Sequence, residues 1–246
     1  MDFKFTRKKG SRKTFIALPG VMSDRVSIDF LLPSLKRHGN VLWVDYPSRR
    51  RTTKTLIKNI LAEIEKRNLS QVIIIGYSYG GTLGRKLIDA IRDSHSGIKI
   101  KKFIAINAAL DAKDLTILGK AATKMSSDLS RTKRSSHWLG YTLKLLWQTS
   151  LDPALFRLGH NVPADQIASA ATRSKELTRS TRQRTPRYFK VPTVLIKAAY
   201  DEYISHKNDK HFKSIFPRLE TKVLRSRHNV LGKHQEELRR LVLSAL

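Results

Sequence analysis

Several apolar segments of the sequence are as long as a β-strand but lack the polar and apolar alternation of a half-exposed strand. They are TFIAL (14–18), NVLWVDYP (40–47), QVIIIGY (71–77), IKKFIAINA (within 98–108), VPTVLIKAA (191–199) and TKVLR (221–225). Continuous apolar runs of this length are typical of parallel strands that are buried on both faces. This feature limits the chain to architectures in which a sheet is covered on both sides.

Helical patterns occur between these segments. Apolar residues recur at helical spacing at Leu56, Ile57, Ile60, Leu61 and Ile64, and again at Leu83, Leu87, Ile88 and Ile91. Further helices are expected over 23–39, over 206–216 and from about 234. Strands that alternate with helices predict an α/β fold with a mostly parallel central sheet and helices on both faces, where ligands bind at the carboxyl ends of the strands.

The alternation is interrupted between residues 111 and 188, where helical patterns occur without a convincing strand. We therefore predict that 1–110 and 189–246 form the α/β core and that 111–188 is a helical cap insertion. A chain of 246 residues with 40% hydrophobic content can bury one sizeable core, which agrees with a single domain and an insertion.

Cysteine is absent from the sequence, which excludes disulfides, thiol nucleophiles and cysteine-ligated metal sites. The apolar runs are much shorter than the roughly 20 residues of a membrane span, and the first residues lack the apolar stretch of a secretory signal. We expect a cytoplasmic protein. A basic organellar presequence is the alternative interpretation of the start, MDFKFTRKKGSRK.

The chain is strongly basic, with 48 Lys and Arg against 20 Asp and Glu and a net charge of +28. Such a charge attracts polyanions. Possible partners are an anionic substrate, an acidic carrier protein or an anionic membrane surface, whereas no specific nucleic-acid motif is present. The alternative is that the charge only solvates the surface. One locally dense basic segment, 173–190, fits either view.

The segment GYSYG (76–80) follows the most apolar strand and precedes a helix. A serine at such a turn has a strained backbone, and its hydroxyl is lifted above the edge of the sheet. The positions two before and two after Ser78 must be small, and Gly76 and Gly80 meet this demand. The pattern resembles the nucleophile elbow of the α/β-hydrolase fold family. The alternative is a glycine-rich turn with a serine that has no catalytic role.

The resemblance implies a serine nucleophile that is followed along the chain by an acid and then a histidine. His228 lies in SRHNVLG, directly after a predicted strand, and occupies the family's histidine position, with His234 in reserve. A histidine there takes the serine proton as the serine attacks. The expected catalytic residues therefore include Ser78 and His228.

The acid implied by the resemblance is Asp201 in AYDEYIS, because it precedes Ile204 by three residues, and Glu202 is expected to point elsewhere. Its carboxylate would orient the histidine and stabilise its charged form. Some members of the fold place the acid one strand earlier, which would make Asp111 or Asp114 the candidate. Otherwise these two aspartates cap the first helix of the insertion.

The resemblance also implies an oxyanion hole made of two backbone N–H groups. Tyr79 supplies one, at the start of the helix that follows Ser78, and the loop LPGVMSD supplies the other, through Val21 or Met22. This loop has a proline before Gly20, where family members usually have a histidine.

The expected function is a serine hydrolase that cleaves carboxylic esters or related acyl compounds through an acyl-enzyme intermediate, with no cofactor and no metal. The sequence HExxH, typical of a zinc hydrolase, is absent. A thioesterase, lysophospholipase, amidase or acyltransferase would use the same residues. A non-catalytic protein of the same fold that binds a ligand or a polyanion is a further alternative.

Overall fold

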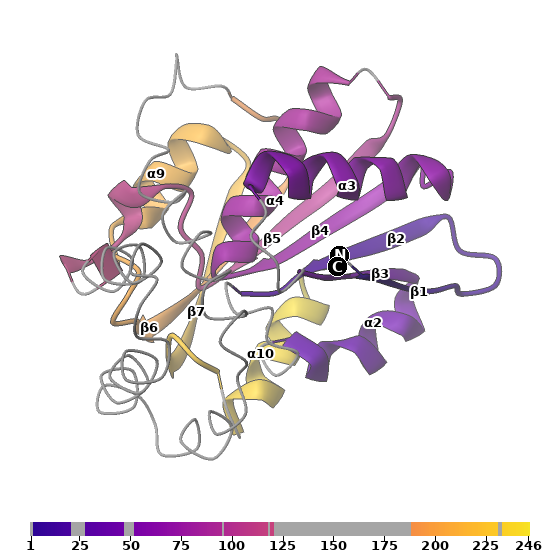
Figure 1. The fold of residues 1–246 in the computed structure, drawn as a ribbon. Helices are drawn as coiled ribbons and strands as arrows, with labels where there is room; N and C mark the ends of the chain where they lie inside the picture. Colours follow the sequence, from indigo (N-terminus) through magenta and orange to yellow (C-terminus); the bar gives the residue numbers. More distant parts are fainter. Residues whose placement is uncertain are drawn as a thin grey trace, which may run out of the picture.

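The computed structural model describes residues 2–20, 28–46, 52–94, 96–117, 119–120, 188–230 and 233–246. Within these residues, seven strands form one sheet in the order β1-β3-β2-β4-β5-β6-β7 (Figure 1). Their bounds are β1 Asp2–Thr6, β2 Lys13–Leu18, β3 Asn40–Asp45, β4 Gln71–Tyr77, β5 Lys99–Ile106, β6 Thr193–Tyr200 and β7 Leu219–Arg227. β1 pairs antiparallel with β3, and all the other neighbours are parallel.

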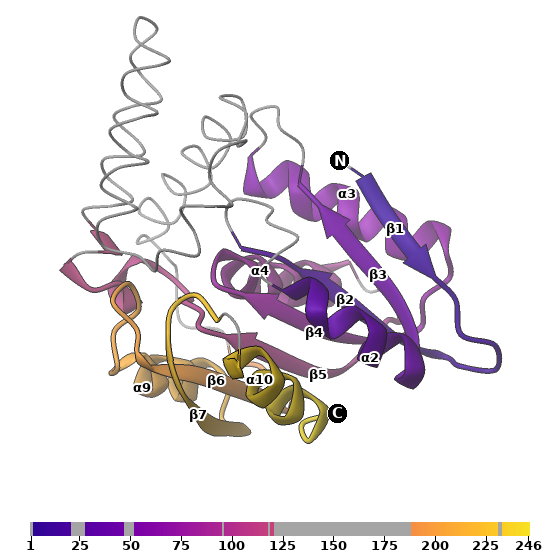
Figure 2. The ribbon, with the colours of Figure 1, turned by 90° about the horizontal axis from the view of Figure 1, so that it is seen from below.

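The helices lie on both faces of the sheet, with α3 and α4 above it and α2 and α10 below it in Figure 1, and Figure 2 shows the same layers from below. Their bounds are η1 Asp29–Leu31, α2 Leu32–His38, α3 Thr53–Lys66, α4 Tyr79–Asp93, η2 Ala112–Asp114, α9 Asn208–Ile215 and α10 Lys233–Leu243. No helix in the described part of the chain has the length and apolar character needed to cross a bilayer.

The two faces of the sheet explain why the strands lack alternation. In β4, Ile74 belongs to the hydrophobic cluster that includes residues of α3 and α4. Ile73 and Ile75 belong to the cluster on the other face, which includes residues of α2 and α10. Successive side chains of a strand point to opposite faces, so both sets must be apolar when both faces are covered. The predicted α/β class with a mostly parallel sheet is therefore confirmed.

The sheet begins one strand earlier than the first expected strand, at β1 instead of 14–18. Phe3 and Phe5 of β1 pack against the core while Lys4 is exposed, and the guanidinium of Arg67 lies 4.6 Å from the ring centroid of Phe5. An edge strand with one exposed face needs only two apolar residues, and this short alternation is easily missed within a basic segment.

The predicted cap insertion, 111–188, lies almost entirely outside the described residues, because 118 and 121–187 are not among them. Its described start contains η2, and its end leads into β6. The cap and the division of the chain at 111 and 188 stay predictions.

Candidate active site

Ser78 lies on the tight turn between the carboxyl end of β4 and the first residue of α4. Its backbone has φ 51° and ψ −117°, a conformation that costs a residue with a side chain about 1–3 kcal/mol. Its N–H donates to the carbonyl of Ile106 at 2.8 Å, and its carbonyl accepts from the N–H of Gly81 at 2.9 Å. These bonds, from the neighbouring strand and the first helical turn, hold the strained residue in place.

The glycines around Ser78 lie too close to neighbouring atoms to carry a side chain. A Cβ at Gly76 would lie 2.3 Å from the carbonyl oxygen of Gly80, and a Cβ at Gly80 would lie 2.1 Å from that of Leu18. A Cβ at Gly81 would lie 2.2 Å from the Cβ of Ala108. The turn is therefore packed directly against the ends of β2 and β5.

The two tyrosines beside Ser78 point to opposite faces of the sheet. Tyr79 packs in the cluster with α3, where its ring meets that of Tyr46 edge-on at 5.9 Å and its hydroxyl lies 3.0 Å from the hydroxyl of Thr53. Tyr77 packs in the cluster on the other face, and its hydroxyl donates to the backbone carbonyl of His228. Bulky residues therefore fit here because neither points toward the serine hydroxyl.

The structure brings Ser78, His228 and Asp201 together, although 150 residues separate the serine from the histidine. The Oγ of Ser78 lies 2.9 Å from Nε2 of His228. The other ring nitrogen, Nδ1, lies 2.9 Å from Oδ2 and 3.0 Å from Oδ1 of Asp201. His228 and Asp201 are both buried, so the hydrogen bonds between them are shielded from water, whereas the bond from Ser78 to His228 is only partly buried.

The surroundings of Asp201 assign the ring protons of His228. Oδ1 of Asp201 accepts from the N–H of Tyr203 at 2.9 Å and from that of Ile204 at 2.8 Å, which fixes the carboxylate beside the ring. A carboxylate accepts hydrogen bonds, so Nδ1 of a neutral His228 carries the proton and Nε2 accepts from the hydroxyl of Ser78. The histidine is thus placed to act as a base toward the serine.

The backbone of His228 is held by three side chains that the sequence did not reveal. Its carbonyl accepts from the hydroxyl of Tyr77 and, at 2.7 Å, from Nδ2 of Asn107, which follows β5 with φ 45°. Its N–H donates to Oε2 of Glu202 at 3.3 Å. The expectation that Glu202 points elsewhere is therefore wrong, because the turn after Asp201 directs both carboxylates toward the histidine.

Tyr203 packs its ring edge-on against the imidazole of His228, with the ring centroids 5.3 Å apart. Burial raises the pKa of the Tyr203 phenol to about 12, and the nearby charges of Glu202 and Asp201 act in the same direction. The phenol therefore stays neutral at physiological pH and adds no charge next to the histidine.

The expected oxyanion donors are described only in part. Val21 and Met22 lie outside the described residues, whereas Tyr79 is the first residue of α4, where the helix dipole favours negative charge. The hydroxyl of Tyr46 donates to the carbonyl of Pro19 at 2.9 Å. A Cβ at Gly20 would lie 3.8 Å from the Cβ of Ser78, so the loop that leads to Val21 starts beside the serine.

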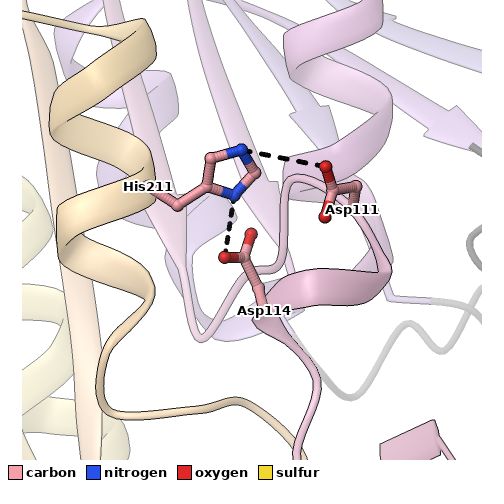
Figure 3. Close-up of side chains that lie close together, drawn as sticks. All are labelled: Asp111, Asp114 and His211. Atoms are coloured by element: carbon pink, nitrogen blue, oxygen red, sulfur yellow. Dashed lines mark hydrogen bonds and ion pairs between the residues drawn. The ribbon is translucent and has the colours of Figure 1, made fainter. Parts of the chain in front are cut away.

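The alternative candidates for the acid and the base contact residues other than Ser78, His228 and Asp201. Nδ1 of His234 lies 3.8 Å from the carboxylate of Glu237 on the same helix. Asp111 and Asp114 face His211 of α9, as Figure 3 shows. Asp111 also caps η2, because its carboxylate accepts from the N–H of Lys113. The acid that contacts the imidazole ring of His228 is therefore Asp201.

No protein-family model matches the sequence, and a search of the curated proteins finds no match. The structure, however, is similar to solved structures over nearly its whole length. An esterase from a marine microorganism matches with a TM-score of 0.72 at 19% identity, covering 100% of this chain and 98% of that one. An esterase from Exiguobacterium antarcticum matches with a TM-score of 0.71 at 17% identity, covering 99% and 94%.

An enol-lactonase from Burkholderia xenovorans LB400 matches with a TM-score of 0.72 at 13% identity, covering 99% of this chain and 95% of that one. Identities this low show a common fold and do not transfer an activity. The sheet order, the strained serine turn between β4 and α4 and these similarities agree: the chain adopts the α/β-hydrolase fold.

Proposed function

We propose that this protein hydrolyses carboxylic esters or related acyl compounds, with Ser78 as nucleophile, His228 as general base and acid, and Asp201 as the carboxylate that orients His228. The observation that carries the proposal is the unbroken series of hydrogen bonds from the hydroxyl of Ser78 through both nitrogens of His228 to Asp201. A serine hydroxyl is a weak nucleophile, and such a series activates it.

In the first half of the reaction, Oγ of Ser78 attacks the carbonyl carbon of the ester while its proton moves to Nε2 of His228. The imidazolium that forms is stabilised by Asp201, which remains ionised. The tetrahedral intermediate then breaks its bond to the leaving oxygen, and His228 returns the proton to that oxygen. The alcohol departs and the acyl group stays on Ser78.

In the second half, His228 takes a proton from water, and the resulting oxygen nucleophile attacks the acyl carbon. The intermediate expels Oγ of Ser78, which recovers its proton from His228, and the carboxylic acid is released. Every step uses the same Nε2 atom. The fixed position of the His228 backbone therefore matters for both halves of the reaction.

Negative charge develops on the substrate oxygen in both halves. We assign its stabilisation to the N–H of Tyr79 at the start of α4 and to the N–H of Val21. The position of Gly20 beside Ser78 supports the second assignment. Removing one donor of this kind typically lowers the rate about a hundredfold to a thousandfold.

The experiment that tests the proposal combines active-site labelling with substrate turnover. Wild type, Ser78→Ala and His228→Ala are treated with a fluorescent fluorophosphonate, and nitrophenyl esters of increasing chain length are assayed in parallel. Ser70→Ala is the matched control, because Ser70 is exposed and precedes β4 at the opposite end of the strand from Ser78.

The proposal predicts that wild type and Ser70→Ala are labelled and hydrolyse esters, whereas Ser78→Ala is not labelled and His228→Ala is labelled slowly. Labelling of Ser78→Ala at the wild-type rate would exclude Ser78 as the nucleophile. A wild type that is neither labelled nor active on any ester would favour a protein of this fold that only binds a ligand.

A further inference from the structure

A second group of ionisable side chains lies at the carboxyl end of the sheet. Asp111 and Asp114 follow β5, and His211 lies on α9, so the group connects two segments that are far apart in the sequence (Figure 3). The side chain of Asp114 is 2% exposed and that of His211 is 24% exposed. The proposed ester hydrolysis does not use any of these three residues directly.

The two carboxylates contact different nitrogens of the same imidazole ring. Nδ1 of His211 lies 2.9 Å from Oδ1 of Asp114, and Nε2 lies 3.7 Å from Oδ2 of Asp111. The three residues offer ligand atoms within 4.8 Å of one another, a grouping that a metal ion can also use. A metal, however, needs the carboxylate oxygens and one ring nitrogen to converge on a single point about 2 Å from each. The observed arrangement instead suits a ring that bridges two carboxylates.

Both carboxylates are also held by backbone N–H groups of their own segment. Oδ2 of Asp114 accepts from the N–H of Leu110 at 2.7 Å, and Oδ1 of Asp111 accepts from the N–H of Lys113 at 2.7 Å. The remaining oxygen of each aspartate faces the ring. Each aspartate therefore uses one oxygen within its own segment and the other toward His211.

The segment that contains these aspartates is bonded to the loop that begins at Asp201. The carbonyl of Asp114 accepts from the N–H of Ser205 at 2.7 Å, and the N–H of Thr116 donates to the carbonyl of Tyr203 at 2.9 Å. The hydroxyl of Thr116 donates to the carbonyl of Glu202 at 2.6 Å. Asp114 and Thr116 thus form hydrogen bonds with three residues of the loop 202–205.

The same loop holds the carboxylate of Asp201. The N–H groups of Tyr203 and Ile204 bind Oδ1 of Asp201, and Ile204 also pairs with Leu115 in an isolated β-bridge. Asp114 contacts this loop through the N–H of Ser205 and contacts α9 through the ring of His211. A shift of α9 relative to η2 would therefore move the residues that aim Asp201 at His228.

We propose that His211 is a positioning residue: by linking Asp111 and Asp114 to α9, it fixes the loop that directs Asp201 toward His228. The inference rests on the proposed function, because it concerns the orientation of the acid in that reaction. His211 does not touch the reacting atoms and acts through Asp114 and the loop 202–205.

The charge state of His211 gives this role a pH dependence. The hydrogen bond to Asp114 raises the pKa of His211 above its ordinary value of 6.5, and the negative charges of Asp114 and Asp111 add to the rise. Burial and the charge of Lys113 oppose it. A protonated ring donates its hydrogen bond to Asp114 and attracts Asp111 through its charge, whereas a neutral ring lacks the charge that attracts Asp111 at 3.7 Å.

The direction of the effect follows from the raised pKa. The contribution of the link to stability is fully present below pH 6.5, the ordinary pKa, and is lost as the pH rises through the raised pKa of the folded protein. The carboxylate of Asp201 should therefore be held less firmly toward His228 as the pH rises through this range.

The test compares wild type with His211→Asn, which keeps an amide donor near the position of Nδ1 but has no charge and no group at the position of Nε2, which faces Asp111. Asp111→Asn removes only the longer contact. His206→Asn is the control, because His206 is an exposed histidine directly after the loop 202–205. The measurements are the thermal midpoint by circular dichroism, and kcat and KM on nitrophenyl acetate, each from pH 5.5 to 9.

We expect His211→Asn to melt about 4 °C below wild type at pH 6 and close to wild type at pH 9. Its kcat at pH 6 should be lower by roughly tenfold with little change in KM, because a small misplacement near the site affects turnover more than binding. Asp111→Asn should show a smaller effect in the same direction, and His206→Asn should show none.

Three outcomes would overturn the inference. A difference in melting between wild type and His211→Asn that is the same at every pH would mean that the charged link does not form. A wild-type kcat in His211→Asn at pH 6 would remove the positioning role. A rise in the midpoint of wild type, but not of His211→Asn, on addition of Zn²⁺ or Mn²⁺ would make the group a metal site instead.

The failure of the proposed function gives a different result. A wild type without activity on any ester would overturn that function, and the positioning role with it, while the melting curves would still decide whether the pH-dependent link exists. An active wild type with a pH-independent effect of His211→Asn would overturn this inference alone.

Discussion

The hydroxyl of Tyr77 donates a hydrogen bond to the backbone carbonyl of His228, 151 residues later in the chain. Tyr77 is the residue before Ser78, so one contact joins the serine turn to the loop that carries the histidine. Asn107, after the neighbouring strand, donates to the same carbonyl at 2.7 Å. The ends of β4 and β5 thus determine where the imidazole stands relative to the serine hydroxyl.

Tyr77→Phe should separate positioning of His228 from packing. The ring stays in the core, but one of the two side-chain donors to the His228 carbonyl is lost. We expect a loss of stability of about 1 kcal/mol and a several-fold decrease in kcat, measured by denaturant unfolding and by ester turnover. Tyr188→Phe, at an exposed tyrosine, is the control. Unchanged turnover in Tyr77→Phe would mean that Asn107 alone is sufficient.

Gly80→Ala tests the close packing of the serine turn. The new Cβ would lie 2.1 Å from the carbonyl oxygen of Leu18, which belongs to a strand and cannot move away easily. We expect a loss of at least 1–3 kcal/mol, typical of overpacking, and a clearly lower melting temperature. Gly20→Ala is the matched control, because its Cβ would meet neighbours at 3.5 Å or more. Equal melting of the two variants would contradict this explanation.

Asp201→Asn tests the orientation of the imidazole. The asparagine can still accept from the N–H groups of Tyr203 and Ile204, but its NH₂ group would face Nδ1 of His228 and favour the wrong tautomer. We expect kcat to fall by roughly 10³-fold to 10⁴-fold while the protein stays folded, as judged by circular dichroism. Asp209→Asn, on α9, should retain activity. A modest effect of Asp201→Asn would point to a different acid.

The sequence was sufficient to predict the sheet because the strands are buried on both faces. Runs such as QVIIIGY leave no other arrangement that hides every side chain, and the helices between them carry one apolar face each. β1 escaped prediction because only Phe3 and Phe5 pack inward, a pattern too short to stand out from the basic residues around it.

The residues of the candidate site also include some that the sequence predicts and some that it does not. Ser78, Asp201 and His228 each follow a predicted strand, and carboxyl ends of parallel strands meet at one edge, so chain order alone brings them together. The contacts of Tyr77, Asn107 and Glu202 go to backbone atoms of His228. Backbone partners carry no sequence signature, and these contacts depend on strand register.

The bridge between His211 and the two aspartates could not be inferred from spacing either. Asp114 and His211 are 97 residues apart, and α9 must pack beside η2 before they meet. From the sequence, Asp111 and Asp114 were expected to be helix caps or an alternative acid. Asp111 does cap η2, and its second oxygen faces the imidazole.

The net charge of +28 leads to a final prediction about substrates. Exposed cations attract an anionic ester toward the protein, and added salt screens this attraction because the Debye length falls to about 10 Å at 0.1 M ionic strength. We expect kcat/KM for an ester with an anionic acyl group to fall several-fold between low salt and about 0.3 M. The neutral ester of the same length should change little, since only the anionic substrate is attracted by the net charge. Equal salt dependence for the two esters would mean that the positive charge plays no part in substrate selection, and that the excess of Lys and Arg serves only to solvate the surface.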